Sequence, residues 1–230
     1  MNVWCDSLFI WEANLFIPWF TCQEVLFITR IRKDPEVRQT ELIDAALELF
    51  SSVGYEKTMI IDIVKKTGVA KGTFYYYFSS KEAILEAICT RWANELATSF
   101  QLKSSQNTAL NKLQFFILQM VLPSEFDVLI DRLWNEKQLN LLYQVWQQQV
   151  QNVFDPLLAD IIQQGNQEGT MDVICINEAI AFFWSTLNCI WEANFLKESS
   201  EVLLIKVQIA ESILERILGI KEGILQLSIT

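Results

Sequence analysis

The sequence predicts an all-α protein. Hydrophobic residues make up 51% of its 230 positions, which is ample for a packed core. Only seven glycines and four prolines interrupt the chain, and its apolar residues recur at helical spacing instead of alternating as in strands. At this length we expect one large domain or two modest ones.

The first helix is predicted to begin at Asp34. An N-cap acid followed by Pro35 in the first turn is a common helix start. An apolar stripe at helical spacing follows, formed by Ile43, Ala46, Leu47 and Phe50. We expect Gly54 to end this helix.

A second and a third helix are predicted on either side of a tight turn. Thr58 is positioned to cap a helix over 59–67. The buried side of that helix is expected to consist of Ile60, Ile61, Ile63 and Val64. Gly68 should end it, because glycine tolerates a positive φ. A short helix then opens at Lys71 and Gly72 and carries three consecutive tyrosines, an arrangement typical of a helix-turn-helix unit built for a DNA groove.

A fourth, longer helix is predicted to start near Ser80 and to run to about Phe100. Ser79, with Glu82 three residues later, has the spacing of a capping box. The apolar positions of this helix are Ile84, Leu85, Ile88, Trp92 and Leu96. It should lead from the helix-turn-helix unit into the second half of the chain.

The second half is also predicted to be helical. The expected helices cover 106–121, 125–136, 137–154, 156–168, 175–196 and 201–218. Pro156 should start or kink a helix, because proline has no backbone N–H to donate. We therefore divide the chain into an apolar extension (1–29), a helix-turn-helix domain (30–80) and a second helical domain (81–230).

The last two predicted helices have wide apolar faces. Two such helices can supply half of a four-helix interface between two copies of a chain. The residues that we expect in this dimerisation face are Phe183, Trp184, Leu187, Trp191, Ile205, Ile209 and Ile213.

Residues 1–29 form an apolar, aromatic segment that fits no standard targeting signal. A membrane span needs about 20 apolar residues with few charges, whereas Glu12, Pro18 and Glu24 interrupt this run. The basic start and small-residue cleavage site of a signal peptide are also missing. Three interpretations stay open: a wrongly chosen upstream start codon, an extra helix packed on the body, and a membrane anchor. We favour the first, because the chain from Arg30 onward resembles an ordinary beginning.

The formal net charge of −10 is unevenly distributed. Residues 30–91 hold ten basic and nine acidic residues, the first 29 hold three acids and no base, and the remainder holds eight bases and sixteen acids. The basic residues at the entry to the least acidic stretch are Arg30, Arg32, Lys33 and Arg38. An acidic remainder would repel DNA, which favours one defined binding face.

The chain has no histidine, which excludes His-based triads, imidazole general bases and histidine metal ligands. Its five cysteines show no Cys-x-x-Cys spacing, and we interpret them as small buried hydrophobes in a reducing cytoplasm. We therefore expect no enzyme, no cofactor, no metal site and a cytoplasmic location.

The stretch from Arg38 to Glu86 resembles the DNA-binding domain of TetR/AcrR-type transcriptional regulators. The matching features are the first-helix pattern, the Gly54-Tyr55 stop, Thr58, the Gly68-Val69 turn, and the run Gly72-Thr73-Phe74-Tyr75-Tyr76-Tyr77-Phe78 followed by Lys81-Glu82. Two positions depart from the family pattern. Ala70 replaces a hydroxyl residue that would cap the recognition helix, and Tyr77 stands where histidine is common.

This resemblance implies a set of DNA contacts. Phe74 and Phe78 should face the domain core and fix the recognition helix. The residues expected to contact DNA are Thr58, Lys71, Gly72, Thr73, Tyr75, Tyr76, Tyr77 and Lys81. Such side chains reach phosphates, base edges or thymine methyls. For the tyrosines, and Tyr77 above all, a partly buried aromatic cluster is the alternative.

The resemblance also implies a homodimer on an inverted-repeat operator, acting as a repressor that a small hydrophobic effector releases. The expected pocket residues are Phe115, Phe116, Trp134, Tyr143 and Trp146, with plain core packing as the alternative for each. Two other functions stay open. One is a membrane-tethered regulator of the same type that uses residues 1–29, and the other is a helical small-molecule enzyme or binding protein without DNA binding.

Overall fold

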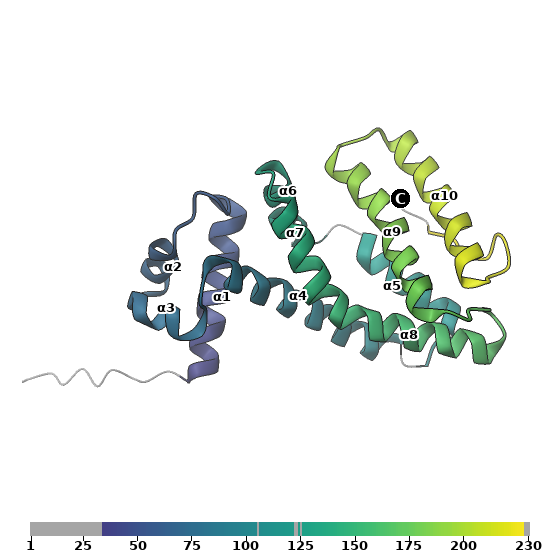
Figure 1. The fold of residues 1–230 in the computed structure, drawn as a ribbon, viewed down its shortest axis with the longest axis horizontal. Coiled ribbons are helices and arrows are strands. Elements are labelled where there is room, and N and C mark those ends of the chain that lie inside the picture. Colours follow the sequence, from purple (N-terminus) through teal and green to yellow (C-terminus); the bar gives the residue numbers. More distant parts are fainter. Residues whose placement is uncertain (1–33, 105, 122–123, 125, 228–230) are drawn as a thin grey trace, which may run out of the picture. The chain divides into compact units, whose positions relative to one another are not determined.

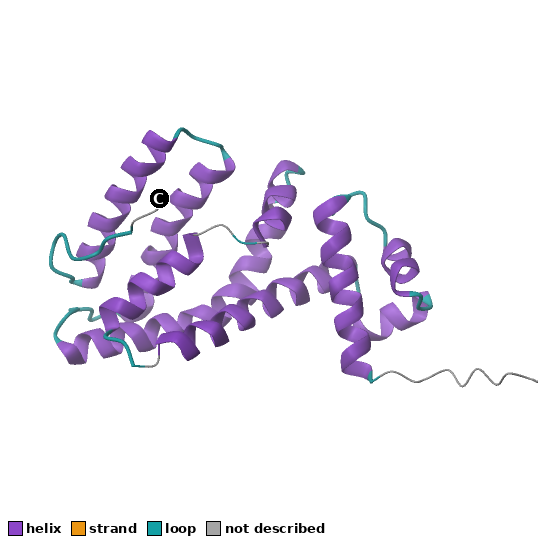
Figure 2. Ribbon diagram, turned by 180° about the vertical axis from the view of Figure 1, so that it is seen from behind, coloured by secondary structure: helices purple, strands orange, loops and turns teal. Residues whose placement is uncertain are grey.

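The computed structural model describes residues 34–104, 106–121, 124 and 126–227. Every regular element over these ranges is a helix, which confirms the predicted all-α class (Figures 1 and 2). The elements are α1 (Pro35–Ser52), α2 (Ile60–Thr67), α3 (Lys71–Tyr77), α4 (Lys81–Ser104), α5 (Ala109–Val121), α6 (Phe126–Asn135), α7 (Leu139–Val145), the π-helical segment η1 (Trp146–Val150), α8 (Gln151–Glu168), α9 (Ile176–Phe195) and α10 (Ser200–Leu218).

Helices α1, α2 and α3 surround one small apolar core. α1 begins as predicted, with the Asp34 carboxylate accepting a hydrogen bond from the Glu36 N–H at 3.0 Å and Pro35 in the first turn. The fully buried side chains of this core are Leu42, Ala46, Phe50, Ile63 and Phe74. Because burying each large apolar side chain contributes about 1.5–3 kcal/mol, this core holds the three short helices in place.

The turn between α2 and α3 depends on Gly68. This residue adopts φ 67°, in the left-handed region, and the following Val69 N–H donates to the Val64 carbonyl at 3.0 Å. A Cβ added at Gly68 would meet no atom within 4 Å, so backbone conformation and not space selects glycine here. The prediction that Gly68 ends α2 is confirmed.

Two local predictions in this region are wrong. Ile61 is exposed instead of buried, because α2 turns only Ile63 and Val64 fully into the core. Ser80, not Ser79, caps α4, since the Ala83 N–H donates to the Ser80 hydroxyl at 3.2 Å. The capping serine is displaced by one position, and Ile61 is one residue of four assigned to the wrong side of a correctly predicted helix.

The predicted helices over 137–154 and 156–168 are joined in the structure. α7 passes through η1 into α8, and Pro156 lies inside α8. A proline at this position cannot donate to the carbonyl of Asn152, and its ring crowds that carbonyl. The irregular π-helical segment lies directly upstream, and such segments are one way for a long helix to accommodate a local disruption.

α9 and α10 form an antiparallel pair (Figure 1). The Ser199 hydroxyl caps α10 by accepting from the Val202 N–H at 3.3 Å. At the far end, the Asp172 N–H donates to the Leu218 carbonyl at 3.1 Å. A Cβ on Gly219 would lie only 2.7 Å from the Asp172 nitrogen, so glycine permits this close approach of the two backbones.

Residues 1–33 contain the predicted extension and three predicted basic residues, Arg30, Arg32 and Lys33, and they lie outside the described residues. The described part of Asp34–Thr230 packs as one compact unit. Within it, no single helix has the length and apolar composition of a membrane span, although α5 and α6 counted together as a bent pair would meet that test by length and composition alone.

Candidate nucleic-acid interface

Helix α3 is anchored to the domain by two phenylalanines. Phe74 is fully buried and Phe78 is nearly so, and their ring centroids lie 5.8 Å apart. The Phe78 N–H closes the helix on the Phe74 carbonyl at 2.8 Å. The prediction that these side chains face the core is confirmed, so the opposite side of α3 must face outward.

That outward side carries Lys71, Gly72, Tyr75 and Tyr76. All four are exposed, and the Tyr76 side chain is 78% exposed. No atom lies within 4 Å of the position of a Cβ on Gly72, so the surface around it is open. The remaining predicted contacts on this helix, Thr73 and Tyr77, are half-buried.

The tyrosine rings are held by their neighbours. Tyr76 and Tyr77 meet edge to face with centroids 4.9 Å apart, and Tyr75 meets Phe74 in the same way at 5.6 Å. The Lys71 ammonium lies 5.8 Å from the Tyr75 ring centroid, within range of a cation–π interaction. The exposed rings of Tyr75 and Tyr76 are therefore each packed against a neighbouring aromatic ring of α3.

Thr58 does not belong to this surface, which corrects the prediction. Its side chain is 2% exposed, and its hydroxyl donates to the Gly54 carbonyl at 2.6 Å. It also does not cap α2. The cap is Met59, whose N–H donates to the Asp62 carboxylate at 2.9 Å. Because this hydroxyl is buried and hydrogen-bonded inside the α1–α2 turn, it cannot reach a phosphate.

Lys81 is also turned inward, against the prediction. Its ammonium donates to the carbonyls of Tyr55 and Thr58 at 2.7 and 3.3 Å and lies 4.1 Å from the Tyr55 ring centroid. The Tyr55 hydroxyl in turn donates to Glu82 at 3.0 Å. Burial, together with the nearby Glu82 carboxylate, raises the pKa of the Tyr55 hydroxyl above its ordinary range. Lys81 thus joins α4 to the α1–α2 turn.

The positive charge that remains near α3 comes from a few exposed lysines. Lys57, Lys65 and Lys71 are exposed, and none forms an ion pair with a described carboxylate. Lys66 pairs with Glu48 at 2.7 Å. Arg38, predicted as part of a basic entry, pairs with Glu41 at 2.8 Å. Among the residues that the structure describes, these three lysines are thus the ones left for a nucleic-acid backbone to meet.

A contact between the α1–α2 turn and the end of α6 was not predicted from the sequence. Arg132 Nη2 donates to the Ser52 carbonyl at 2.7 Å, and the Glu136 carboxylate accepts from the Glu56 N–H at 3.0 Å. Gln138 donates to the Glu56 carboxylate at 2.5 Å. These hydrogen bonds attach the second helical domain to the three-helix domain at a second place, besides α4.

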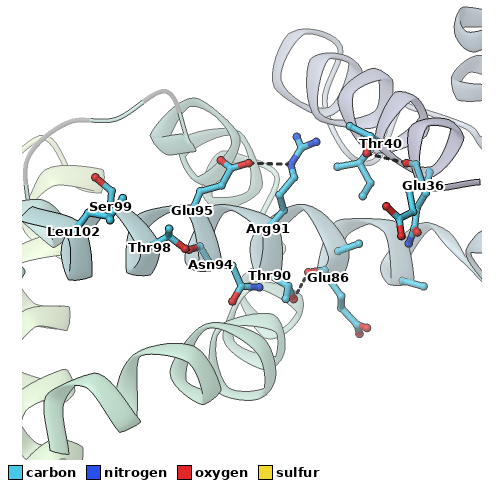
Figure 3. A pocket seen from close by; sticks show the side chains of 14 residues that line it. Glu36, Thr40, Glu86, Thr90, Arg91, Asn94, Glu95, Thr98, Ser99 and Leu102 are labelled. Atoms are coloured by element: carbon cyan, nitrogen blue, oxygen red, sulfur yellow. Dashed lines mark hydrogen bonds and ion pairs between the residues drawn. The ribbon is translucent and has the colours of Figure 1, made fainter. Parts of the chain in front are cut away.

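An open groove follows the junction of α1 and α4. Figure 3 shows its hydroxyl and acidic lining, which includes Glu36 and Thr40 from α1 and Glu95 and Thr98 from α4. Arg91 crosses it and bonds Asp44 at 2.7 Å. With acidic side chains on both walls, this groove is unsuited to a phosphate and is distinct from the α3 surface.

Two of the five predicted pocket residues meet in one aromatic cluster. Phe116 and Trp146 both contact Trp184, at centroid distances of 6.0 and 5.7 Å. The Trp184 indole donates to Asp155 at 2.7 Å, and burial raises the pKa of that carboxyl above its ordinary value. The Trp191 indole donates to the Met120 carbonyl at 2.9 Å beside it.

The other three predicted pocket residues stack on other rings or are exposed, although Phe100, the partner of Phe115, also contacts Phe116 at 5.6 Å. Phe115 stacks on Phe100, Trp134 stacks on Phe195, and the Tyr143 side chain is 66% exposed. Sequence spacing could not reveal this, because α5, α6 and α7 rotate their aromatic residues towards different neighbours.

The residues predicted for the dimerisation face divide into an exposed and a buried group. Ile205, Ile209 and Ile213 form an exposed apolar row on α10. In contrast, Phe183, Trp184 and Leu187 are buried in the core, and Trp191 is half-buried there, so these four cannot form an outer face. The outward aromatic residue of α9 is instead Phe182, which is 62% exposed. Glu178, Ser185 and Glu192 share the outward side of α9 with Phe182, so helical spacing distinguishes this side from the buried one.

Comparison with known proteins singles out the same N-terminal region. Residues 42–88 match the family model described as bacterial regulatory proteins, tetR family. Over 56 residues, 24% of this chain, it is 48% identical to an uncharacterised HTH-type transcriptional regulator, YvdT, of Bacillus subtilis. It is also 33% identical over 88 residues, 37% of this chain, to IcaR of Staphylococcus aureus, a negative transcriptional regulator of a biofilm operon. These matches span only 29% and 46% of the two relatives.

The likeness of fold extends through most of the chain. The structure of the transcriptional regulator FadR from Bacillus subtilis, in complex with stearoyl-CoA, superposes with a TM-score of 0.57 and 23% identity. The superposition covers 78% of this chain and 97% of that one. The two-part helical architecture, with helix-turn-helix first, is thus that of solved regulators of this kind.

Proposed function

The chain carries the DNA-binding domain of the TetR family of bacterial regulatory proteins, and on that premise we propose that it is a ligand-responsive transcriptional regulator. One observation carries the proposal. Phe74 and Phe78 bury one side of α3, while Lys71, Tyr75 and Tyr76 stand exposed on the other. A short helix fixed in this way fits the width of the DNA major groove.

The regulator would bind DNA as a homodimer. One seven-residue helix makes too few contacts for tight, specific binding, whereas two copies about 34–36 Å apart can read successive major grooves of an inverted repeat. The exposed isoleucine row of α10, together with the exposed Phe182 of α9, is the apolar surface that we assign to the interface between copies.

The regulatory half would respond to a small hydrophobic effector. We assign the effector site to the packed aromatic cluster around Phe116, Trp146 and Trp184, which an effector would have to open, with the Asp155 carboxyl beside it as polar anchor. The similar FadR structure was solved with stearoyl-CoA, an apolar chain on a polar carrier. Repression is the mode we propose, in keeping with the negative regulator IcaR. A regulator of this kind needs no enzymatic activity and acts in the cytoplasm, where its DNA is.

A gel shift with the full chain and the DNA upstream of its own gene tests the proposal. Tyr76→Ala and Lys71→Ala should weaken binding at least tenfold, and binding should fall steeply with salt because phosphate contacts release counterions. Tyr143→Ala and Lys221→Ala alter equally exposed residues away from α3 and should bind as the parent does. Equal binding by all four variants would contradict the assigned surface, and absence of any specific shift would contradict DNA-binding regulation.

A further inference from the structure

The exposed side of α3 offers almost none of the side chains that read bases by hydrogen bonds. In the major groove, arginine or lysine pairs with guanine, asparagine or glutamine with adenine, and aspartate or glutamate with cytosine. The helix sequence Lys-Gly-Thr-Phe-Tyr-Tyr-Tyr contains one member of that set, Lys71. The hydroxyls of Thr73 and the tyrosines can also bond to base edges, but a hydroxyl accepts several bases, so the hydrogen bond from this helix that selects one base comes from Lys71.

What α3 does offer is apolar surface. Tyr75 and Tyr76 expose 48% and 78% of their area, and Thr73, which carries a methyl group, is half-buried. Gly72 adds no side chain and leaves open space around it. The only apolar group that base pairs display in the major groove is the C5 methyl of thymine.

The rings are also positioned before binding. Tyr76 rests edge to face on Tyr77, and Tyr75 rests on the buried Phe74. A ring that is already held loses little side-chain entropy on contact, so each methyl that it covers contributes most of its burial free energy. The Lys71 ammonium lies 5.8 Å from the Tyr75 ring centroid, which places this base-selective donor next to the apolar surface of the ring.

We infer that each α3 reads its half-site mainly through thymine methyls. Tyr75, Tyr76 and Thr73 would cover the methyls of successive A·T pairs, and Lys71 would pair with one adjacent guanine. This inference rests on the proposed function and makes it specific: the operator half-site is a run of A·T pairs bordered by one G·C pair.

The test begins with selection of binding sites from random double-stranded DNA by the full chain. The selected half-sites should be A·T runs with a single guanine. Deoxyuridine then replaces thymine at each half-site position, which removes the methyl and leaves base pairing intact. Removing a contacted methyl should weaken binding about fourfold, since burying one such group contributes about 0.8 kcal/mol. The same replacement in the flanks should have no effect.

Two variants assign the contact. Tyr76→Phe keeps the ring and should retain the discrimination between thymine and uracil, whereas Tyr76→Ala should lose it at one position while remaining folded by circular dichroism. Equal affinity for thymine and uracil half-sites, or selection of G·C-rich half-sites, overturns the inference but leaves DNA binding in place. Failure to select any sequence overturns the proposed function as well.

Discussion

The Glu136 carboxylate occupies the space that a side chain on Gly54 would need. Gly54 adopts φ 109°, and Glu136 on the loop after α6 reaches over it to accept the Glu56 N–H at 3.0 Å. One glycine therefore serves two purposes. It permits the turn between α1 and α2, and it admits a carboxylate from the second helical domain.

Gly54→Ala should destabilise the protein by more than a conformational penalty alone. A residue held in so unfavourable a region costs about 1–3 kcal/mol, and the new Cβ would displace Glu136 as well. Gly68→Ala is the matched control, because Gly68 also has a positive φ but open space around it, and it should cost only about 1–2 kcal/mol. Thermal unfolding measures both. An equal loss in the two variants would show that Glu136 adds nothing.

Glu136→Ala should partly rescue Gly54→Ala. If the two groups compete for one space, their effects on the free energy of unfolding are not additive, and contacting residues commonly couple by about 0.5–3 kcal/mol. The double variant should therefore be more stable than the sum of the single losses predicts. Chemical denaturation of the four proteins gives the coupling energy, and strict additivity would contradict the shared-space explanation.

Lys71→Met and Lys81→Met should separate a DNA contact from a structural one. Lys81 donates to two backbone carbonyls, and replacing a donor of this kind costs about 1–3 kcal/mol of stability. Lys71 has no such partner among the described residues, so its loss should weaken DNA binding and leave the melting temperature unchanged. Melting temperatures and DNA affinities of both variants, measured beside the parent, distinguish the two roles. A variant of Lys81 with parental stability but weak DNA binding would restore the original expectation for that residue.

The prediction from sequence succeeded where a local signal is sufficient. Asp34 with Pro35, and Gly68, define helix ends through their own backbone chemistry, and the pair Phe74 and Phe78 orients α3 by spacing. The prediction failed for Thr58, whose hydroxyl could either cap the next helix or bond to the preceding turn. Tertiary packing determines which of the two bonds forms, and in the structure the hydroxyl bonds to the Gly54 carbonyl of the turn.

Longer-range contacts account for the remaining errors. Lys81 reaches a carbonyl 26 residues earlier in the chain, and Glu136 reaches an N–H 80 residues earlier. Phe182 and Phe183 are adjacent in sequence, yet one lies outside and the other inside. Helical spacing does separate these two: Phe182 lies on the side of α9 that carries the exposed Glu178, Ser185 and Glu192, whereas Phe183 lies on the buried, apolar side. The α9 residues predicted for the dimerisation face belong to that apolar side, which the core buries.

Tyr55→Phe should reduce the loss of stability at alkaline pH. The folded state raises the pKa of Tyr55 through burial and the adjacent Glu82 carboxylate, whereas the unfolded chain ionises this phenol near pH 10. The stabilisation is therefore complete below about pH 10 and is lost as the pH rises towards the folded pKa. Denaturation midpoints between pH 8 and 11 measure it. Tyr143→Phe, an exposed control, should leave the slope unchanged, and an unchanged slope in Tyr55→Phe would contradict the assignment.

Ile209→Glu should separate the dimer and abolish tight operator binding. Ile209 is exposed at the middle of the isoleucine row on α10, so a carboxylate there would be buried without a partner in an interface between copies. The monomer would retain its folded helices, because Ile209 is not part of the core, but would lose the second recognition helix and with it most of the affinity for an inverted repeat. Sedimentation and gel shift measure the two effects. Ile174→Glu places the same charge on another exposed isoleucine, away from the row, and should remain dimeric. A dimeric Ile209→Glu protein would show that the copies meet on a different face, and the assignment of the α10 row would then be wrong.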